Sequence, residues 1–146
     1  MPVIRMRAPL SGAHLMIFSG RVTEDELLGQ FGAIDETLDE SSHDWLTLDL
    51  GFADISELSF DVLIKLKAIL APKLAVMKAR RFFEVCIVSL RPLNDPIYMA
   101  WQSFVGEDED YPSNPLFYSD LNSMCDYLGY GEAERTELFN LCAAVR

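Results

Sequence analysis

The chain has 146 residues, of which half are apolar and 24% are charged. This length allows one domain with a substantial core, and the composition is typical of a globular protein and excludes a disordered chain. The formal net charge of −11 argues against nonspecific binding of nucleic acid, because a polyphosphate would be repelled at long range. No apolar run approaches the roughly 20 residues that cross a bilayer, and the first residues lack the apolar core of a signal peptide. We therefore expect a cytoplasmic protein.

The cysteines and histidines do not form a recognisable chemical motif. Cys86, Cys125 and Cys142 each stand among apolar neighbours, which predicts small buried side chains in a reducing compartment. His14 and His43 are far from them in sequence, so we expect neither a zinc site nor a cofactor. A nucleophilic Ser or Cys would need a positioned base, and no glycine-rich phosphate loop is present. The sequence thus favours a protein without catalytic residues that is not an enzyme.

The first part of the chain predicts a hairpin followed by a helix. "VIRMRAPL" alternates apolar and basic residues as a strand does, "SGAH" is typical of a turn, and "LMIFSG" from Leu15 indicates a second strand. Thr23 and Glu26 have the spacing of a capping box at a helix start. Apolar residues then follow at three- and four-residue steps, namely Leu27, Leu28, Phe31, Ile34 and Leu38.

The middle of the chain predicts a strand, a long helix and a second strand. "WLTLDL" from Trp45 indicates the first strand, which we expect to lead directly into a polar turn. One helical face is then predicted to contain Phe60, Leu63, Ile64, Leu70, Leu74 and Met77. Pro72 interrupts this pattern and predicts a kink or two abutting helices. "FFEVCIVSL" from Phe82 is apolar on both faces, as a central strand is.

The last part of the chain predicts a helix, a short strand and two further helices. Asp95 and Pro96 begin a helix toward Phe104, because proline is favoured at the first helical position. "LFYS" indicates a short strand, and the helix after it is closed by Gly129. A final helix is expected from Glu132 to Ala143.

This order predicts an α/β fold, with a mixed, largely parallel sheet of about five strands and four to five helices packed on it. One domain is expected over residues 1–146, with a short C-terminal helical extension from about residue 131.

Three stretches resemble the STAS and SpoIIAA-like domain family. "LTLDLGFADISELSFDVLIKL" resembles its central strand, turn and leucine-rich helix. "FSGRVTEDEL" is similar to a glycine-ended strand and acid-capped helix near the start of such chains, and "LFYSDLNSMCDYLG" to their closing strand and helix. The matches span Leu15 to Tyr130 and rest on pattern and order. The resemblance implies the layered SpoIIAA-like fold and a signalling role by protein association.

The family's phosphorylation motif is altered in this chain. Anti-sigma-factor antagonists of the family have Asp, two Ser or Thr, and Gly at the helix start, and a kinase phosphorylates one hydroxyl. Aligned on Val62 and Leu63, Ser56 takes the Asp position and Ser59 the Gly position. Glu57 and Leu58 stand where the family has its two hydroxyl residues.

Helix capping is the competing interpretation of this turn. Asp54, Ser56 and Ser59 lie where a helix needs acceptors for its first N–H groups, and Asp54 and Glu57 have capping-box spacing. We favour capping over phosphorylation of Ser56 or Ser59, since Asp54, Glu57 and Asp61 would oppose a phosphate that the helix dipole attracts.

Two charged stretches offer further candidate surfaces. The stretch from Lys65 to Arg81 carries basic residues and no acidic one, which suits an acidic lipid or protein surface. We favour a solvated face, neutralised in part by an acidic helix at Glu24 to Glu40. The acidic stretch Gly106 to Asp110 lacks the remaining ligands of a calcium loop, and we favour a solvated, mobile loop. Its aromatic neighbours, Trp101, Phe104 and Tyr111, fit either a core or a rim for a partner.

Three hypotheses follow for function. The first is a noncatalytic domain that binds a protein partner, or a second copy as a homodimer, through Asp54, Glu57, Asp61 and Lys65 at the second helix and its turn. The second is a module of the same fold that binds a lipid or small apolar ligand between the second and third helices. The third is a phosphorylation switch at Ser56 or Ser59.

Overall fold

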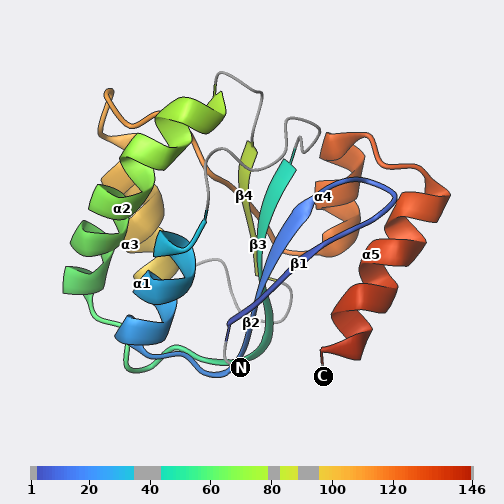
Figure 1. Cartoon of the computed structure of the whole chain (residues 1–146), viewed down its shortest axis with the longest axis horizontal. Helices are drawn as coiled ribbons and strands as arrows, with labels where there is room; N and C mark the ends of the chain where they lie inside the picture. Colours follow the sequence, from blue (N-terminus) through green and yellow to red (C-terminus); the bar gives the residue numbers. More distant parts are fainter. Residues whose placement is uncertain (1–2, 35–43, 79–82, 89–95, 146) are drawn as a thin grey trace.

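A computed structural model of the chain describes residues 3–34, 44–78, 83–88 and 96–145 (Figure 1). Its strands are β1 (Val3–Arg7), β2 (His14–Arg21), β3 (Asp44–Asp54), β4 (Phe83–Val88) and β5 (Leu116–Tyr118). Its helices are α1 (Glu24–Gly32), α2 (Phe60–Lys78), α3 (Pro96–Gly106), α4 (Leu121–Leu128) and α5 (Glu132–Ala144). Strands and helices alternate from β2 to α4, so the predicted α/β class is confirmed.

The strands form one mixed sheet in the order β1-β2-β3-β4-β5. β1 and β2 pair antiparallel as the expected hairpin, and the pairs from β2 to β5 are parallel. The crossover helices α1, α2 and α3 lie on the same face of the sheet (Figure 1). Because each crossover also moves one strand in the same direction, all three have the same hand, as the preference for right-handed crossovers leads one to expect.

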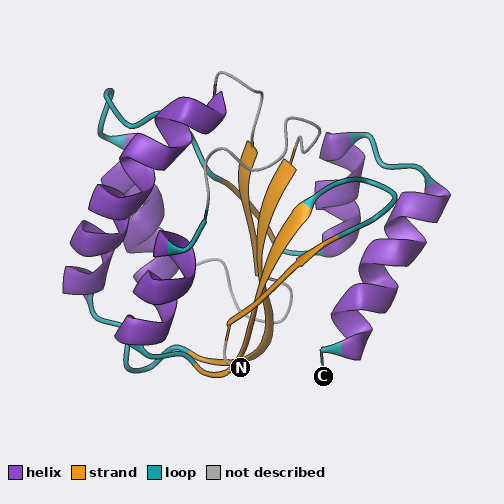
Figure 2. Cartoon of the chain, viewed as in Figure 1, coloured by secondary structure: helices purple, strands orange, loops and turns teal. Residues whose placement is uncertain are grey.

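The sheet separates two helical layers, with α1, α2 and α3 on one face and α4 and α5 on the other (Figure 2). Each layer covers its own buried apolar cluster. Phe18 and Trp45 belong to the cluster under α1, α2 and α3, whereas Ile17 and Leu46 belong to the cluster under α4 and α5. Neighbouring strand residues enter opposite clusters because side chains alternate across a strand.

β3 lies in the middle of the sheet, and residues 44–50 are all buried. Asp44 is buried among apolar side chains, and its Oδ2 accepts a hydrogen bond from the Tyr130 hydroxyl at 2.7 Å. Cys125 and Cys142 lie in the same layer as free, buried thiols, as expected. Burial raises the pKa of both, that of Cys142 to about 11. The side chain of Cys86 lies outside the described residues.

α1 begins as predicted but ends earlier. Thr23 is its N-cap, and its side chain accepts the N–H of Glu26 at 3.2 Å. Oε1 of Glu26 is buried without a hydrogen-bond partner among the described residues, so this oxygen does not complete the capping box. The helix ends at Gly32 instead of continuing along the apolar stripe, consistent with the low helix propensity of its glycines. Leu38 lies outside the described residues.

β3 is longer than predicted, so the turn after it starts later. The strand continues from Leu50 through Gly51, which has a φ of 86°, to Asp54. The pairing of β2 with β3 shifts register between Phe18 and Gly20, which lets the end of β2 stay paired with these additional residues. The polar turn therefore comprises residues 55–59.

α2 is one helix with Pro72 inside it, so of the two predicted alternatives, a kink or two abutting helices, the second is wrong. The predicted apolar face is not buried at its start, because the Phe60 and Ile64 side chains are 60% and 59% exposed. The residues that are buried on this helix are Val62, Leu63, Leu66, Leu70 and Leu74. The apolar surface of α2 is thus wider than the sheet covers, and the part that contains Phe60 and Ile64 is left in solvent. The side chain of Met77 lies outside the described residues.

The C-terminal elements follow the sequence patterns. Pro96 is the first residue of α3, while its expected cap, Asp95, lies outside the described residues. Gly129 closes α4 with a φ of 74°, a left-handed conformation that glycine adopts at little cost. α5 places Leu138 and Cys142 in the buried cluster beneath it, so it forms part of the second helical layer.

We predict that, because of the buried Tyr130 hydroxyl, the free energy of unfolding falls as pH rises in the alkaline range. Burial, and then the hydrogen bond to Asp44, raise the pKa of Tyr130 above its ordinary value. Above about pH 10 the unfolded chain loses this proton while the folded chain keeps it, so the free energy of unfolding falls by up to about 1.4 kcal/mol per pH unit. In urea titrations between about pH 8 and 11, wild type should lose stability more steeply than Tyr130→Phe. Parallel slopes for the two proteins would contradict this assignment.

Candidate interaction site

The turn between β3 and α2 has a defined backbone conformation. Oδ1 of Asp54 accepts the N–H of Ser56 at 2.9 Å, and the carbonyl of Ile55 accepts the N–H of Leu58 at 3.0 Å. The N–H of Val22 donates to the carbonyl of Asp54 at 2.9 Å, which joins the end of β2 to the start of the turn. Ile55 is buried and anchors the turn in the core. The turn is therefore held from within and from β2.

The predicted capping box at Asp54 and Glu57 is wrong. α2 begins at Phe60, six residues after Asp54, and the Asp54 carboxylate bonds within the turn instead. Glu57 forms an ion pair with Arg21 at the end of β2, and this hydrogen bond lowers the pKa of Glu57. Both side chains are exposed, so the pair orients the turn and adds little to stability. Ser59 precedes the helix directly, and its carbonyl accepts the N–H of Val62 at 3.2 Å.

A surface groove of about 670 Å³ lies between this turn and the start of α3. The turn contributes Ser56, Leu58 and Ser59, and α3 contributes Pro96 and Ile97. The remaining residues of its wall are Ala53, Asp54, Ile55 and Phe60. The structure thus brings the candidates Asp54, Ser56 and Ser59 together around one groove.

The other predicted contact residues lie beside the groove and do not line it. Glu57 and Asp61 are exposed next to it. Lys65 faces α1 instead, where its Nζ lies 2.6 Å from Oε1 of Glu24, and this hydrogen bond raises the pKa of Lys65. Lys65 therefore contacts α1 through an exposed ion pair that adds little to stability, and it is not part of the groove.

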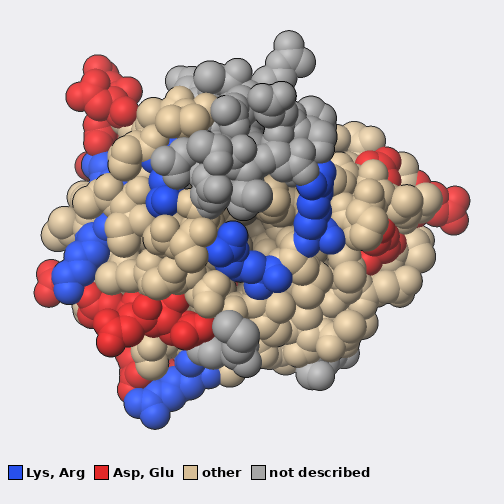
Figure 3. Space-filling model, in the orientation of Figure 1, with Lys and Arg blue, Asp and Glu red and all other residues tan. Residues whose placement is uncertain are grey.

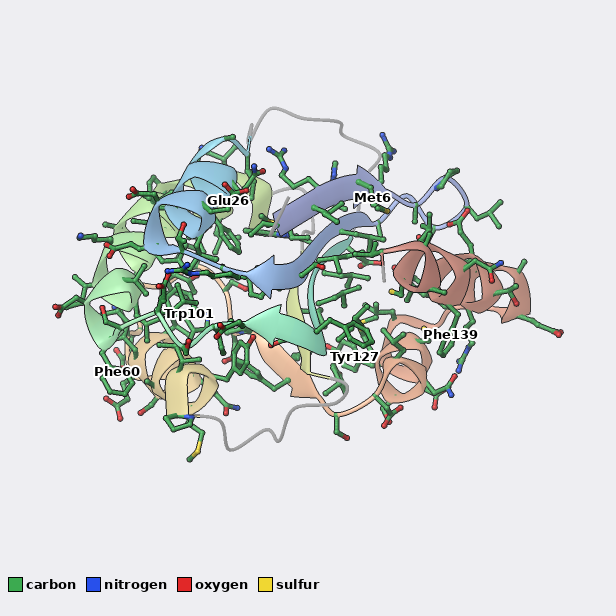
Figure 4. All side chains as sticks on the ribbon, turned by 90° about the horizontal axis from the view of Figure 1, so that it is seen from below. Met6, Glu26, Phe60, Trp101, Tyr127 and Phe139 are labelled. Atoms are coloured by element: carbon green, nitrogen blue, oxygen red, sulfur yellow. The ribbon has the colours of Figure 1, made fainter. Side chains whose placement is uncertain are left out.

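Each element that borders the groove exposes a large apolar side chain. Phe52 of β3 is 42% exposed, Phe60 of α2 is 60% exposed, and Met99 of α3 is 52% exposed. Figure 4 shows Phe60 at the outer edge of the molecule, whereas Trp101 of α3 lies inside, between the helices and the sheet. Of these three residues, Phe60 is part of the groove wall, and an exposed apolar side chain at a groove is typical of a contact surface.

Sequence reasoning missed Pro96 and Ile97 as members of this site. In a parallel sheet, the segments that follow neighbouring strands meet at the same edge. Since α2 follows β3 and α3 follows β4, the predicted order already placed the two helix starts side by side. The strand order would therefore have been sufficient to add the start of α3 to the candidate site.

Asp49, in the strand of the stretch that resembles the family, is buried and hydrogen-bonded within the fold. It is 1% exposed, its Oδ1 accepts the N–H of Gly51 at 2.9 Å, and its Oδ2 accepts the Tyr98 hydroxyl at 2.6 Å. The Tyr98 bond fastens α3 to β3, and the Gly51 bond fixes the backbone where β3 turns toward the groove. Asp49 therefore positions both walls of the groove from below.

Each described lysine of the basic stretch contacts a neighbouring element. Lys65 is still 59% exposed, as predicted for a solvated face, whereas Lys67 and Lys73 are partly buried and the prediction is wrong for these two. Besides Lys65, Lys73 donates to the carbonyl of Ile34 at 2.6 Å, and Lys67 lies 2.5 Å from Oδ2 of Asp108. Lys78, Arg80 and Arg81 lie outside the described side chains. The expected neutralisation by the acidic helix α1 is confirmed at Lys65.

The acidic loop is fastened to the domain through Asp108. The Lys67 ion pair lowers the pKa of Asp108, and the Lys67 ammonium also lies 4.3 Å from the centre of the Phe104 ring. Trp101 and Tyr111 are buried and meet edge to face, 6.1 Å apart. Of the two interpretations of these aromatic residues, Trp101 and Tyr111 fit the core.

Acidic side chains gather at one corner of the molecule, over the first turn of α1 (lower left in Figure 3). The ion pairs of Arg21 with Glu57 and of Lys65 with Glu24 place this corner beside the turn and the start of α2. Among the described residues that line the groove, one is acidic and none is basic. The groove therefore lies in a negative surrounding.

Comparison with protein-family models, with curated proteins and with solved structures found no match. Across the ranges that the structure describes, no cluster of three or more His, Cys, Asp or Glu could hold a metal ion. None of the helices in these ranges is both long and apolar enough to span a membrane.

We predict that Tyr98→Phe destabilises the protein by about 1–3 kcal/mol, because it leaves the buried Asp49 carboxylate with one donor fewer. Urea denaturation measures the loss. The matched control is Tyr127→Phe, since Tyr127 is 56% exposed and should change stability by less than about 0.5 kcal/mol. Equal stability of the two variants would show that the Tyr98 hydroxyl does not fasten α3 to β3.

Proposed function

We propose that this chain is a noncatalytic regulatory domain of the STAS or SpoIIAA-like type that works by binding a protein partner. The contact surface is the groove between the turn and α3, together with the exposed first turns of α2. The observation that carries the proposal is this groove, because it lies at the turn of the resemblance and is bordered by Phe60.

The strand, turn and helix of the resemblance are present as β3, residues 55–59 and α2. The position of the family's hydroxyl pair is occupied by Glu57 and Leu58, and these residues have structural roles here. Glu57 pairs with Arg21, and Leu58 lines the groove. Association through this surface therefore does not need a phosphate at that position.

The chemistry of the surface favours a partner that is apolar at its centre and basic at its edge. Phe60 and Ile64 lie one helical turn apart on the exposed side of α2 and offer an apolar contact. Asp54 and Asp61 are exposed close to that contact in the sequence and add negative charge beside it, whereas the charge of Glu57 is paired with Arg21. A second copy is a less favourable partner, because a two-fold interface would bring these acidic residues against one another.

We predict that Phe60→Ser with Ile64→Ser reduces recovery of the specific partner at least tenfold, when the tagged full chain is purified from its own cells and the bound proteins are quantified. A tenfold loss corresponds to about 1.4 kcal/mol of binding free energy, within the range expected for an exposed aromatic and aliphatic pair. Recovery should also fall as salt is raised, because screening weakens the attraction between acidic and basic surfaces.

The control is Leu10→Ser, since Leu10 is 62% exposed and its N–H donates to Glu137 in the other helical layer. This variant should recover the partner as wild type does. A partner that both variants retain would place the contact elsewhere. A wild-type chain that is monomeric and recovers no specific protein would contradict the proposal.

A phosphorylation switch at Ser56 or Ser59 is the competing proposal, because both side chains are exposed in the groove. Asp54 stands in the same wall and would repel a phosphate, so we predict no phosphorylated fraction. Intact-mass measurement of protein from its own cells under several growth conditions tests this. A phosphorylated fraction that Ser59→Ala or Ser56→Ala removes would establish the switch instead.

A further inference from the structure

β1 is an edge of the sheet, and none of the described strands pairs with it on its outer side. It lies between the two helical layers (Figures 1 and 4). In an antiparallel pair, every second residue of an edge strand directs its N–H and C=O away from the sheet, where another strand can bond to them. β5, at the opposite edge, has three residues, and β1 has five. β1 is therefore the longer of the two edges at which a strand can be added.

The side chains of β1 form two faces of different chemistry. Val3 belongs to the buried cluster under α1, α2 and α3, so Arg5 and Arg7 project from the same face of the sheet, and both are exposed. Ile4 and Met6 project from the other face and are partly buried. An added strand thus meets two guanidinium groups on one face and two half-covered apolar side chains on the other.

The two arginines give this edge a charge opposite to the net charge of the chain, which is −11. Basic side chains lie over the middle of the molecule in Figure 3, where Figure 1 places β1 and β2, and acidic side chains lie toward the left and right. The positive charge acts on His14, which is opposite Arg7 in the register. Burial, and then the charges of Arg7 and Arg5, lower the pKa of His14.

Protection of the sheet edge does not explain these arginines. Charged residues on an edge strand keep copies of a chain from pairing edge to edge, but a net charge of −11 already keeps copies apart, and basic residues reduce it. Arg5 forms no ion pair with any residue that the structure describes. Four basic side chains on other elements are each paired with a carboxylate, namely those of Arg21, Lys65, Lys67 and Arg135. The charge of Arg5 is therefore available to a partner.

We propose that β1 binds an extended acidic segment of a partner protein, which joins the sheet as an additional strand. Carboxylates of that segment lie opposite Arg5 and Arg7, because opposite charges on neighbouring strands attract. Aliphatic residues between them cover Ile4 and Met6, and hydrogen bonds between the two backbones supply affinity. A second copy is a less favourable occupant, since two β1 strands paired antiparallel about a two-fold axis bring arginine against arginine. This edge is separate from the groove and the first turns of α2, so neither proposal depends on the other.

The test is a titration of the purified full chain with a capped heptapeptide of alternating valine and glutamate, followed by NMR of the backbone amides. The amide signals of Ile4, Arg5 and Met6 should shift saturably, while those of α2 should not respond. A peptide with lysine in place of glutamate should bind more weakly by about tenfold or more, because the arginines repel it. A glutamate peptide that is N-methylated along its backbone should lose at least as much, because it has no N–H to donate to β1.

Arg5→Glu with Arg7→Glu gives a second measurement. This variant should bind the glutamate peptide about tenfold more weakly than wild type does, and the lysine peptide about tenfold more tightly. The matched control is Arg21→Glu with Lys65→Glu, which reverses as many charges at exposed positions outside β1. At a salt concentration of about 0.15 M these distant charges are screened, so the control should bind the glutamate peptide as wild type does. If the β1 variant does not fold, the three peptides on wild type still decide the question.

A glutamate peptide that shifts no β1 amide saturably would overturn the proposal. So would equal binding of the lysine peptide or the N-methylated peptide, or an equal loss in the control variant, since each would show contact without the proposed strand pairing. Inorganic phosphate that causes the same saturable shifts and displaces the peptide would identify an anion site at the arginines instead, and strand addition would be wrong.

Discussion

The rest of the structure depends on β3 being buried on both faces. Burial of apolar side chains attracts both helical layers to this strand. That attraction has no preferred direction, so it does not determine the position of each layer. Two buried carboxylates supply that direction. Asp44 accepts the Tyr130 hydroxyl from the α4 and α5 layer, and Asp49 accepts the Tyr98 hydroxyl from α3 in the other layer. Each layer is thus fastened to the same strand by one tyrosine and one aspartate.

These bonds specify position at some cost in stability. A carboxylate in an apolar environment is expensive unless its oxygens are hydrogen-bonded, so any other placement of either layer would leave a buried charge with a missing donor. Tyr98 is the more consequential of the two donors for the surface. It fixes the start of α3, and Ile97 beside it lines the groove. The geometry of the candidate site therefore depends on a hydrogen bond to the buried Asp49 carboxylate beneath it.

Local patterns in the sequence were sufficient to predict the α/β class. Strand alternation, the helix start at Pro96 and the helix end at Gly129 each depend only on residues that are close in sequence. Local patterns did not predict the contacts of side chains whose partners are distant in sequence. Glu57 has the spacing of a capping residue, yet Arg21, 36 positions away, binds it instead. Phe60 and Ile64 continue the apolar pattern of α2, but a periodic stripe does not say how much of its width the sheet will cover. The partial burial of Lys67 and Lys73 was not predicted either, because their partners, Asp108 and the carbonyl of Ile34, lie in distant segments.

Leu58 is the residue at which this chain differs most clearly from the family that it resembles, because it stands at one of the two hydroxyl positions. A hydroxyl at that position would be a target for a kinase, and its phosphate would be attracted by the start of α2. A leucine there cannot carry charge, and it lines the groove. Leu58 and Ile97 also pack against the buried cluster under α1, α2 and α3. The wall of the groove therefore depends on the core beneath it, which a phosphorylated hydroxyl at this position would disturb.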